Sequence, residues 1–220
     1  MEWPGSRDTN TVKVALLKGD FGNALLKNMM NYVTSLAWGD YKDGNYKIHN
    51  SGTAFFLNLG AATFFVTAAH VYEGYVEAKL KDPNLRCFLG SMEVDLKARC
   101  IGCLGSKRLD IATFSIELEE VEKLNKHVCY GAASWPPEKV SEGAGILIGG
   151  FPGLEREQVD AQEYSFGLYA ALTPVSSSSD RHFGCVLDRA GWIDTFGQGL
   201  PPWLLIGWLD FLRGSDGTQI

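Results

Sequence analysis

Two side chains in this sequence have the types and the spacing of a general base and the carboxylate that orients it. His70 follows the apolar run Phe65-Val66-Thr67-Ala68-Ala69, and Asp110 begins the run Asp110-Ile111-Ala112, 40 residues later. A carboxylate that accepts the imidazole N–H fixes the tautomer of the ring and stabilises the imidazolium that forms when the ring takes a proton. The pair therefore predicts acid–base catalysis. Taken singly, Asp110 also fits a residue that caps a turn, and His70 a histidine with ordinary structural contacts.

The runs around these residues resemble the chymotrypsin clan of serine peptidases, to which the trypsin-like enzymes belong. Thr67-Ala68-Ala69-His70 matches the family's histidine motif, residues 52–56 resemble the strand that precedes it, and residues 109–114 match the context of the family's aspartate. Residues 146–153 give a weaker match to a strand of the second barrel. The resemblance extends over about residues 50–155.

The resemblance implies a trypsin-like serine endopeptidase that hydrolyses peptide bonds in a peptide or protein substrate and uses no cofactor. In that family the histidine is the general base and the aspartate orients it, which assigns these roles to His70 and Asp110. Both roles are expectations that rest on the matched motifs.

The nucleophile is where the sequence departs from the family. The family carries its serine in Gly-x-Ser-Gly-Gly-Pro, whose glycines let two backbone N–H groups point at the developing oxyanion, and this sequence has no such motif. The nearest match is Ser215 in Arg213-Gly214-Ser215-Asp216-Gly217, and five residues follow it. The catalytic set is thus predicted as His70, Asp110 and Ser215. The alternative is a catalytically inactive peptidase-like scaffold that binds a peptide or protein partner.

Other candidate nucleophiles match less well. Cys185 resembles the cysteine nucleophiles of the same fold but lacks the Gly-Gly context, and Ser176–Ser179 are interpreted as a polar loop. Cys100 and Cys103 form a single Cys-x-x-Cys, with His127 and Cys129 downstream. A zinc site is the alternative for these four, but paired Cys-x-x-Cys knuckles are the specific signal, so no metal is predicted.

The elements that must position these side chains are short and mostly β. Apolar, β-prone runs separated by Gly, Pro, Asn and Asp favour many short strands, with a hairpin whose turn is Leu59-Gly60. We expect a mostly β, chymotrypsin-like double β-barrel with an N-terminal helix over 22–37 and a second barrel that lacks its last strands. The strands are predicted near 52–58, 61–67, 85–90, 92–103, 110–118, 127–134, 144–151, 164–173 and 182–189.

The predicted domains are an N-terminal extension over 1–45, a first barrel over 46–122 and a second barrel over 123–220. A charged stretch at 117–126 is the predicted connection between the two halves. An incomplete second barrel would leave strand edges unpaired and apolar side chains exposed near 203–212, which predicts self-association.

Composition excludes several other classes. The net charge is -6 and the basic residues are scattered, so no nucleic-acid footprint is expected. No run approaches the roughly 20 apolar residues of a membrane helix, and no signal peptide is recognised, so no membrane partner and a cytoplasmic location are predicted. The five cysteines, an odd number, are expected to be reduced thiols.

Overall fold

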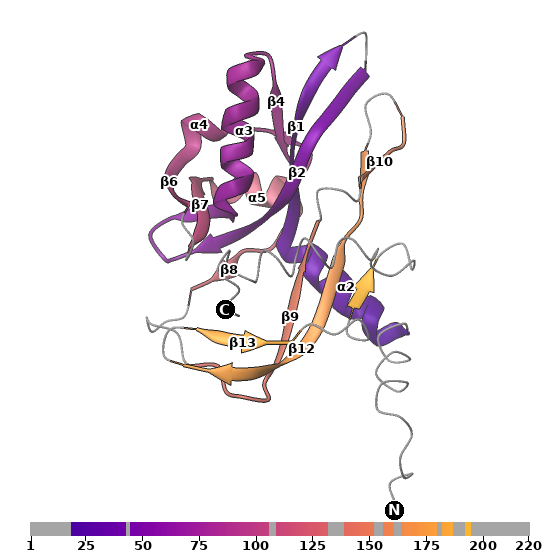
Figure 1. The fold of residues 1–220 in the computed structure, drawn as a ribbon, viewed down its shortest axis with the longest axis vertical. Coiled ribbons are helices and arrows are strands. Elements are labelled where there is room, and N and C mark those ends of the chain that lie inside the picture. The colour runs from indigo at the N-terminus through magenta and orange to yellow at the C-terminus, as the bar shows by residue number, and fades with distance from the viewer. Residues whose placement is uncertain are drawn as a thin grey trace, which may run out of the picture. The chain divides into compact units, whose positions relative to one another are not determined.

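The computed structural model is mostly β and divides into two compact units (Figure 1). It describes residues 19–42, 45–105, 109–131, 139–151, 156–160, 164–179, 182–186 and 192–194. The major unit comprises Met30–Pro137 and Gly150–Leu168, and the minor unit comprises Met1–Met29, Glu138–Gly149 and Tyr169–Ile220. The predicted domain boundaries at 45 and 122 stay predictions.

The major unit is built on an eight-stranded sheet in the order β5-β4-β1-β2-β3-β7-β6, with β8 paired to β2. All pairs are antiparallel except β2 with β8. Among the described residues β5 and β6 are the two ends of this order, so the sheet stays open. The strands are β1 (Val33–Lys42), β2 (Asn45–Asn58), β3 (Thr63–Thr67), β4 (Arg86–Leu89), β5 (Met92–Glu93), β6 (Cys100–Gly105), β7 (Asp110–Ser115) and β8 (Cys129–Tyr130).

Three helices and a hairpin complete the major unit. The helices are α3 (Ala69–Lys81), α4 (Leu96–Arg99) and α5 (Leu118–Lys123), and the hairpin consists of β10 (Arg156–Gln158) and β11 (Tyr164–Phe166). The main core contains Trp38, Phe56, Phe65 and Phe114 from the sheet, all at most 2% exposed, and Tyr75 from α3. Tyr75 meets the Trp38 ring edge to face at 6.1 Å. This packing holds α3 against one face of the sheet.

The minor unit has a small antiparallel sheet around the long strand β12. Its elements are α2 (Asp20–Tyr32), which continues into β1 of the major unit, and β9 (Gly145–Gly150), β12 (Tyr169–Ser178), β13 (Phe183–Cys185) and β14 (Trp192–Asp194). β12 pairs with β9, β13 and β14. No helix in the described parts of the chain is long and apolar enough to cross a membrane.

The hairpin predicted across residues 52–67 is confirmed, but its turn is longer than the predicted Leu59-Gly60: β3 begins at Thr63, and residues 59–62 connect the strands. Phe55 lies opposite Val66, and the register runs to Asn58 opposite Thr63. Gly60 has a φ of +92°, a conformation that favours glycine, and its N–H donates to the side chain of Asn58 at 2.7 Å. The turn is therefore held by the side chain that ends β2.

The structure corrects several local predictions, among them the strand expected over 92–103, which helix α4 interrupts at Leu96–Arg99. The helix expected over 22–37 ends at Tyr32, because β1 begins at Val33 and pairs with β2 on one side and β4 on the other. No helix was predicted over Ala69–Lys81, where α3 forms. Three of the four serines expected in a loop lie in β12, where pairing with β13 orders them.

Candidate active site

His70 is positioned by the junction between β3 and α3. Thr67, the last residue of β3, donates its hydroxyl to the carbonyl of Thr53 in β2 at 2.7 Å, which fixes the end of the strand. Ala68 is extended, with a ψ of 143°, and α3 begins at the buried Ala69. The two alanines let the chain turn from strand to helix within one residue, so His70 lies in the first turn of α3.

Gly52 allows this first turn to lie close to the sheet. A Cβ at Gly52 would lie 2.8 Å from Cγ2 and 2.9 Å from Cγ1 of Val71, closer than side-chain atoms approach one another. Val71, the residue after His70, therefore packs where the strand has no side chain. The glycine of the predicted Gly52-Thr53-Ala54 strand thus has a packing role in placing His70.

Asp110 reaches His70 through the register of β3 with β7. Thr67 lies opposite Ala112 in this antiparallel pair, so Asp110 extends beyond the end of β3 on the side where α3 begins. On its other side Asp110 lies opposite Gly105 of β6. Two positions that are 40 residues apart in the chain thereby become neighbours.

The Asp110 carboxylate makes two hydrogen bonds to His70. Oδ2 is 2.5 Å from Nδ1 of the imidazole, and Oδ1 accepts the backbone N–H of His70 at 2.9 Å. An ionised carboxylate can only accept, so its contact places the imidazole proton on Nδ1. The side chain of His70 is 60% exposed and that of Asp110 is 22% exposed. The contact with Asp110 thus holds the ring at Nδ1, and more than half of the His70 side chain is exposed.

The same carboxylate caps helix α3. The residue at the N-cap position, Ala68, has no side chain that could accept a hydrogen bond from the first turn, and these N–H groups need acceptors. Oδ1 of Asp110 supplies one, and a negative charge at a helix N-terminus is also favourable. Both interpretations of Asp110 from the sequence are therefore compatible: it caps a local structure and it orients the imidazole.

Further carboxylate and thiol groups lie near this pair. Glu73, one turn after His70 on α3, has its carboxylate next to Gly105, where a Cβ would be 2.2 Å from Oε1. Burial, followed by the charges of Glu73 and the neighbouring groups Cys100 and Asp110, raises the pKa of the Cys103 thiol. Cys103 is therefore protonated near neutral pH and is a poor nucleophile.

Thr53 connects the sheet to residues 150–151, part of the weaker sequence match. Its Oγ1 accepts the N–H of Phe151 at 2.7 Å and lies 3.3 Å from the carbonyl oxygen of Phe151, while its own carbonyl accepts the Thr67 hydroxyl. A Cβ at Gly150 would lie 2.5 Å from Thr53 Oγ1. The network Phe151–Thr53–Thr67 thus ends three residues before His70. Neither threonine has a role that is predicted from the sequence.

The candidate nucleophiles do not belong to the described part of the major unit, which holds His70 and Asp110. Ser215 lies outside the described residues. Cys185 lies in β13, and burial raises the pKa of its thiol. Ser179 bonds His182 across the β12–β13 turn: its hydroxyl donates to the carbonyl at 2.9 Å and accepts the N–H at 3.1 Å. Its hydroxyl is therefore engaged in holding a turn.

The cysteines show no paired or metal-binding arrangement in the described part of the chain. Cys87, Cys100, Cys103, Cys129 and Cys185 are free thiols. Within the described ranges, no group of three or more His, Cys, Asp or Glu side chains is arranged to hold a metal ion. Cys100 and Cys103 both lie in β6.

Comparison with known proteins does not identify a family. No protein-family model matches the chain, and no curated protein matches. A solved chain from a study entitled "Aromatic interactions drive the coupled folding and binding of the intrinsically disordered Sesbania mosaic virus VPg protein" aligns with a TM-score of 0.32 and 14% identity, covering 70% of this chain and 72% of that chain. A similarity at this level carries no argument about fold or activity.

Proposed function

We propose that this chain is a member of the chymotrypsin clan that acts as a trypsin-like serine endopeptidase, with His70 as general base and Asp110 as its orienting carboxylate. The observation that carries the proposal is the 2.5 Å contact between Asp110 Oδ2 and His70 Nδ1. This contact joins the histidine motif and the aspartate motif that resemble the family. As in the family, the histidine comes before the aspartate in the chain. A chymotrypsin-like double β-barrel is part of the same proposal.

The proposed chemistry is hydrolysis of a peptide bond. With Nδ1 bound to Asp110, Nε2 is the nitrogen that would take the proton from the Ser215 hydroxyl as Oγ attacks the substrate carbonyl. Asp110 would stabilise the imidazolium, which then returns the proton to the leaving amine. Water, giving its proton to the same imidazole, would then hydrolyse the acyl ester on Ser215 and restore the hydroxyl. The reaction needs no cofactor. The exposed edge of His70 gives a substrate room to approach.

A second candidate is an inactive peptidase-like scaffold that binds a peptide or protein partner. One specific observation favours it: the sequence lacks Gly-x-Ser-Gly-Gly, so the glycines that would form the oxyanion hole around Ser215 are missing. Loss of a properly held nucleophile costs roughly a millionfold in kcat in enzymes of this type. The two candidates therefore differ sharply in reactivity.

Labelling with a fluorophosphonate probe separates the two candidates. The full chain is compared with His70→Ala, Ser215→Ala and the control Ser179→Ala, whose hydroxyl lies in the hairpin turn. An active peptidase loses labelling in the first two variants and keeps it in the third. Absence of labelling in a wild-type chain that unfolds cooperatively contradicts the peptidase and favours the scaffold.

Labelling that persists in Ser215→Ala but disappears in His70→Ala would assign the nucleophile to another residue. Sedimentation velocity on the same preparations tests the predicted self-association. A single monomeric species at all concentrations would contradict that prediction.

A further inference from the structure

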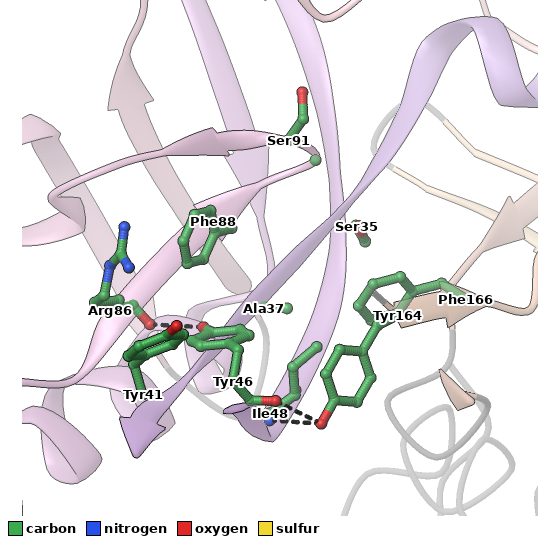
Figure 2. A pocket seen from close by; sticks show the side chains of 11 residues that line it. Ser35, Ala37, Tyr41, Tyr46, Ile48, Arg86, Phe88, Ser91, Tyr164 and Phe166 are labelled. Carbon is green, nitrogen blue, oxygen red and sulfur yellow. Dashed lines mark hydrogen bonds between the residues drawn. The ribbon is translucent and has the colours of Figure 1, made fainter. Parts of the chain in front are cut away.

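The major unit contains a cavity lined largely by aromatic rings. Its volume is about 550 Å³, within the roughly 300–1,000 Å³ that small-molecule sites occupy. Strands β1, β2, β4 and β11 supply its walls (Figure 2). Six side chains dominate the lining: Tyr41, Tyr46, Arg86, Phe88, Tyr164 and Phe166. None of these six side chains belongs to a motif that is recognisable in the sequence.

The cavity lies on the opposite face of the sheet from α3. Side chains alternate along a strand, and in β1 Trp38 belongs to the core that packs against α3, whereas Ala37 belongs to a second cluster with Tyr46 and Ile48. Ala37 lines the cavity. His70, in the first turn of α3, is therefore on the other side of this sheet, and the cavity is separate from the candidate active site.

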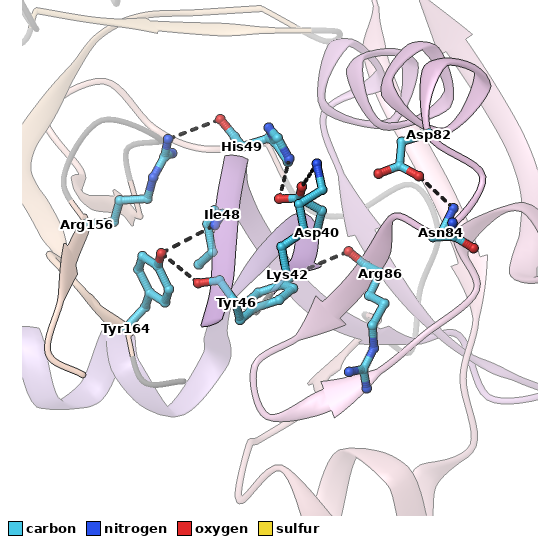
Figure 3. A network of polar contacts seen from close by, with 10 residues as sticks. All are labelled: Asp40, Lys42, Tyr46, Ile48, His49, Asp82, Asn84, Arg86, Arg156 and Tyr164. Carbon is cyan, nitrogen blue, oxygen red and sulfur yellow. Dashed lines mark hydrogen bonds and ion pairs between the residues drawn. The ribbon is translucent and has the colours of Figure 1, made fainter. Parts of the chain in front are cut away.

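Hydrogen bonds fix two of the rings before any ligand binds (Figure 3). The Tyr164 hydroxyl donates to the carbonyl of Tyr46 at 2.9 Å and lies 3.5 Å from the N–H of Ile48, which donates to it. The Tyr46 hydroxyl donates to the carbonyl of Arg86 at 3.2 Å. A ring that is already held loses little conformational entropy on binding, which favours affinity.

The rings also pack against one another in edge-to-face geometry. Tyr46 meets Phe88 at 5.2 Å and Tyr164 at 6.4 Å, with interplanar angles of 75° and 90°. Aromatic rings prefer edge-to-face or offset neighbours, and the open side of this cluster offers the same type of contact to another ring.

A positively charged side chain of the protein itself already lies against this aromatic cluster. The Arg86 guanidinium lies over the Phe88 ring at 5.1 Å from the centroid. It also binds both carboxylate oxygens of Glu93, through Nε at 2.9 Å and Nη2 at 2.5 Å. A second cation would lie beside a like charge, and an anion would meet an arginine that already has a carboxylate. The electrostatics therefore favour an uncharged ligand.

We propose that this cavity is a binding site for a small, uncharged molecule that carries a planar aromatic ring. The ring packs among Tyr46, Phe88 and Tyr164, and a hydrogen-bond acceptor on the ligand faces the Arg86 side of the cavity. This site goes beyond the proposed peptidase function and does not depend on the reactivity of Ser215.

The test uses three probes of similar size on the full chain, with affinities measured by calorimetry or ligand-observed NMR. Indole-3-acetamide is neutral and aromatic, cyclohexylacetamide is neutral and saturated, and tryptamine is a cation. We expect indole-3-acetamide to bind roughly tenfold more tightly than cyclohexylacetamide, the size of one aromatic contact beyond burial of area. It should also bind more tightly than tryptamine, whose positive charge would lie beside the Arg86 guanidinium. Equal binding of the aromatic and saturated amides, or tighter binding of tryptamine, would overturn the proposal.

Three variants test whether indole-3-acetamide binds in this cavity. Ser91→Trp places a large ring in the cavity from an exposed turn position that lines it, and is expected to abolish binding of indole-3-acetamide. Tyr164→Phe keeps the ring, removes the hydroxyl that fixes it, and should weaken binding severalfold. The control Leu80→Ala changes a side chain on α3 that is 79% exposed and should bind like the wild type. Undiminished binding by a folded Ser91→Trp protein would place the probe elsewhere and refute the site.

Discussion

Thr67 lies opposite Ala112 in the pairing of β3 with β7, and this register places Asp110 beside the first turn of α3. The carboxylate of Asp110 then has two partners in His70, the ring Nδ1 and the backbone N–H. One side chain thus completes the helix N-terminus and orients the imidazole, so the stability of α3 and the geometry of the candidate active site are linked through a single residue.

The tautomer of His70 follows from this contact. We expect the neutral imidazole to carry its proton on Nδ1 in the wild type, because the ionised Asp110 can only accept. In Asp110→Asn the amide can also donate, so the Nε2–H tautomer becomes populated. Long-range ¹H–¹⁵N correlation spectra measure both states. Glu73→Gln, which removes a nearby carboxylate but not the bond, is the control; an Nε2–H tautomer in the wild type would contradict the geometry.

The capping role of Asp110 predicts a loss of stability that is separate from any catalytic role. Asp110→Ala removes the acceptor for the backbone N–H of His70 and is expected to lower the free energy of unfolding by about 1 kcal/mol. His70→Ala keeps that N–H and its acceptor, and should lower the free energy of unfolding by less. Urea unfolding of both variants provides the comparison. Equal losses would show that Asp110 does not stabilise α3 as a cap.

The close packing of Val71 on Gly52 predicts that even a methyl group at position 52 is harmful. Gly52→Ala should destabilise the protein by about 1–3 kcal/mol, because the new Cβ overlaps both Val71 methyl groups. Gly102→Ala is the matched control, since a Cβ there has no neighbour within 4 Å. Chemical unfolding measures both. Adding Val71→Ala to Gly52→Ala should recover part of the loss; no recovery would mean that the strain lies elsewhere.

The local signals in the sequence were sufficient for the hairpin that leads to His70. Its two apolar runs are β-prone. In the turn between them, Gly60 has a positive φ, and its N–H donates to the side chain of Asn58, only two residues earlier. The pairing of His70 with Asp110 was predicted only through the resemblance to a family, since no local pattern indicates which strands become neighbours.

Helix α3 was missed because its N-terminal cap is not local. Ala68 gives no capping signal, and the carboxylate that serves the first turn comes from Asp110, 40 residues later. At Val33 the opposite occurs: a helix is predicted and a strand forms, again because of contacts that are distant in the sequence. The apolar spacing of 22–37 fits a helix, but strands β2 and β4 pair with both edges of β1, and tertiary pairing decides the conformation.

The bond from Phe151 to Thr53 predicts a local change in hydrogen exchange. In Thr53→Val the amide of Phe151 loses its acceptor, so its exchange should become roughly tenfold faster, as expected for loss of one ordinary hydrogen bond. Thr67→Val removes the neighbouring hydroxyl and leaves the acceptor of Phe151 intact. Exchange followed by NMR or mass spectrometry should therefore distinguish the two variants. The same acceleration in both would contradict a specific role for Thr53.

The bond between Arg99 and Glu120 predicts a pH-dependent contribution to stability. The Arg99 guanidinium binds both Glu120 oxygens at 2.7 Å and lowers the pKa of Glu120 to about 2. Because the folded-state pKa lies below the unfolded value, the stabilisation is complete above about pH 4.5 and is lost as the pH falls toward 2.

Glu120→Gln should therefore be less stable than the wild type at pH 6, by at most about 3 kcal/mol. The difference should vanish near pH 2. Glu119→Gln, in the same helix, should follow the wild-type pH dependence, and a constant difference between wild type and Glu120→Gln at every pH would contradict the charge-based explanation.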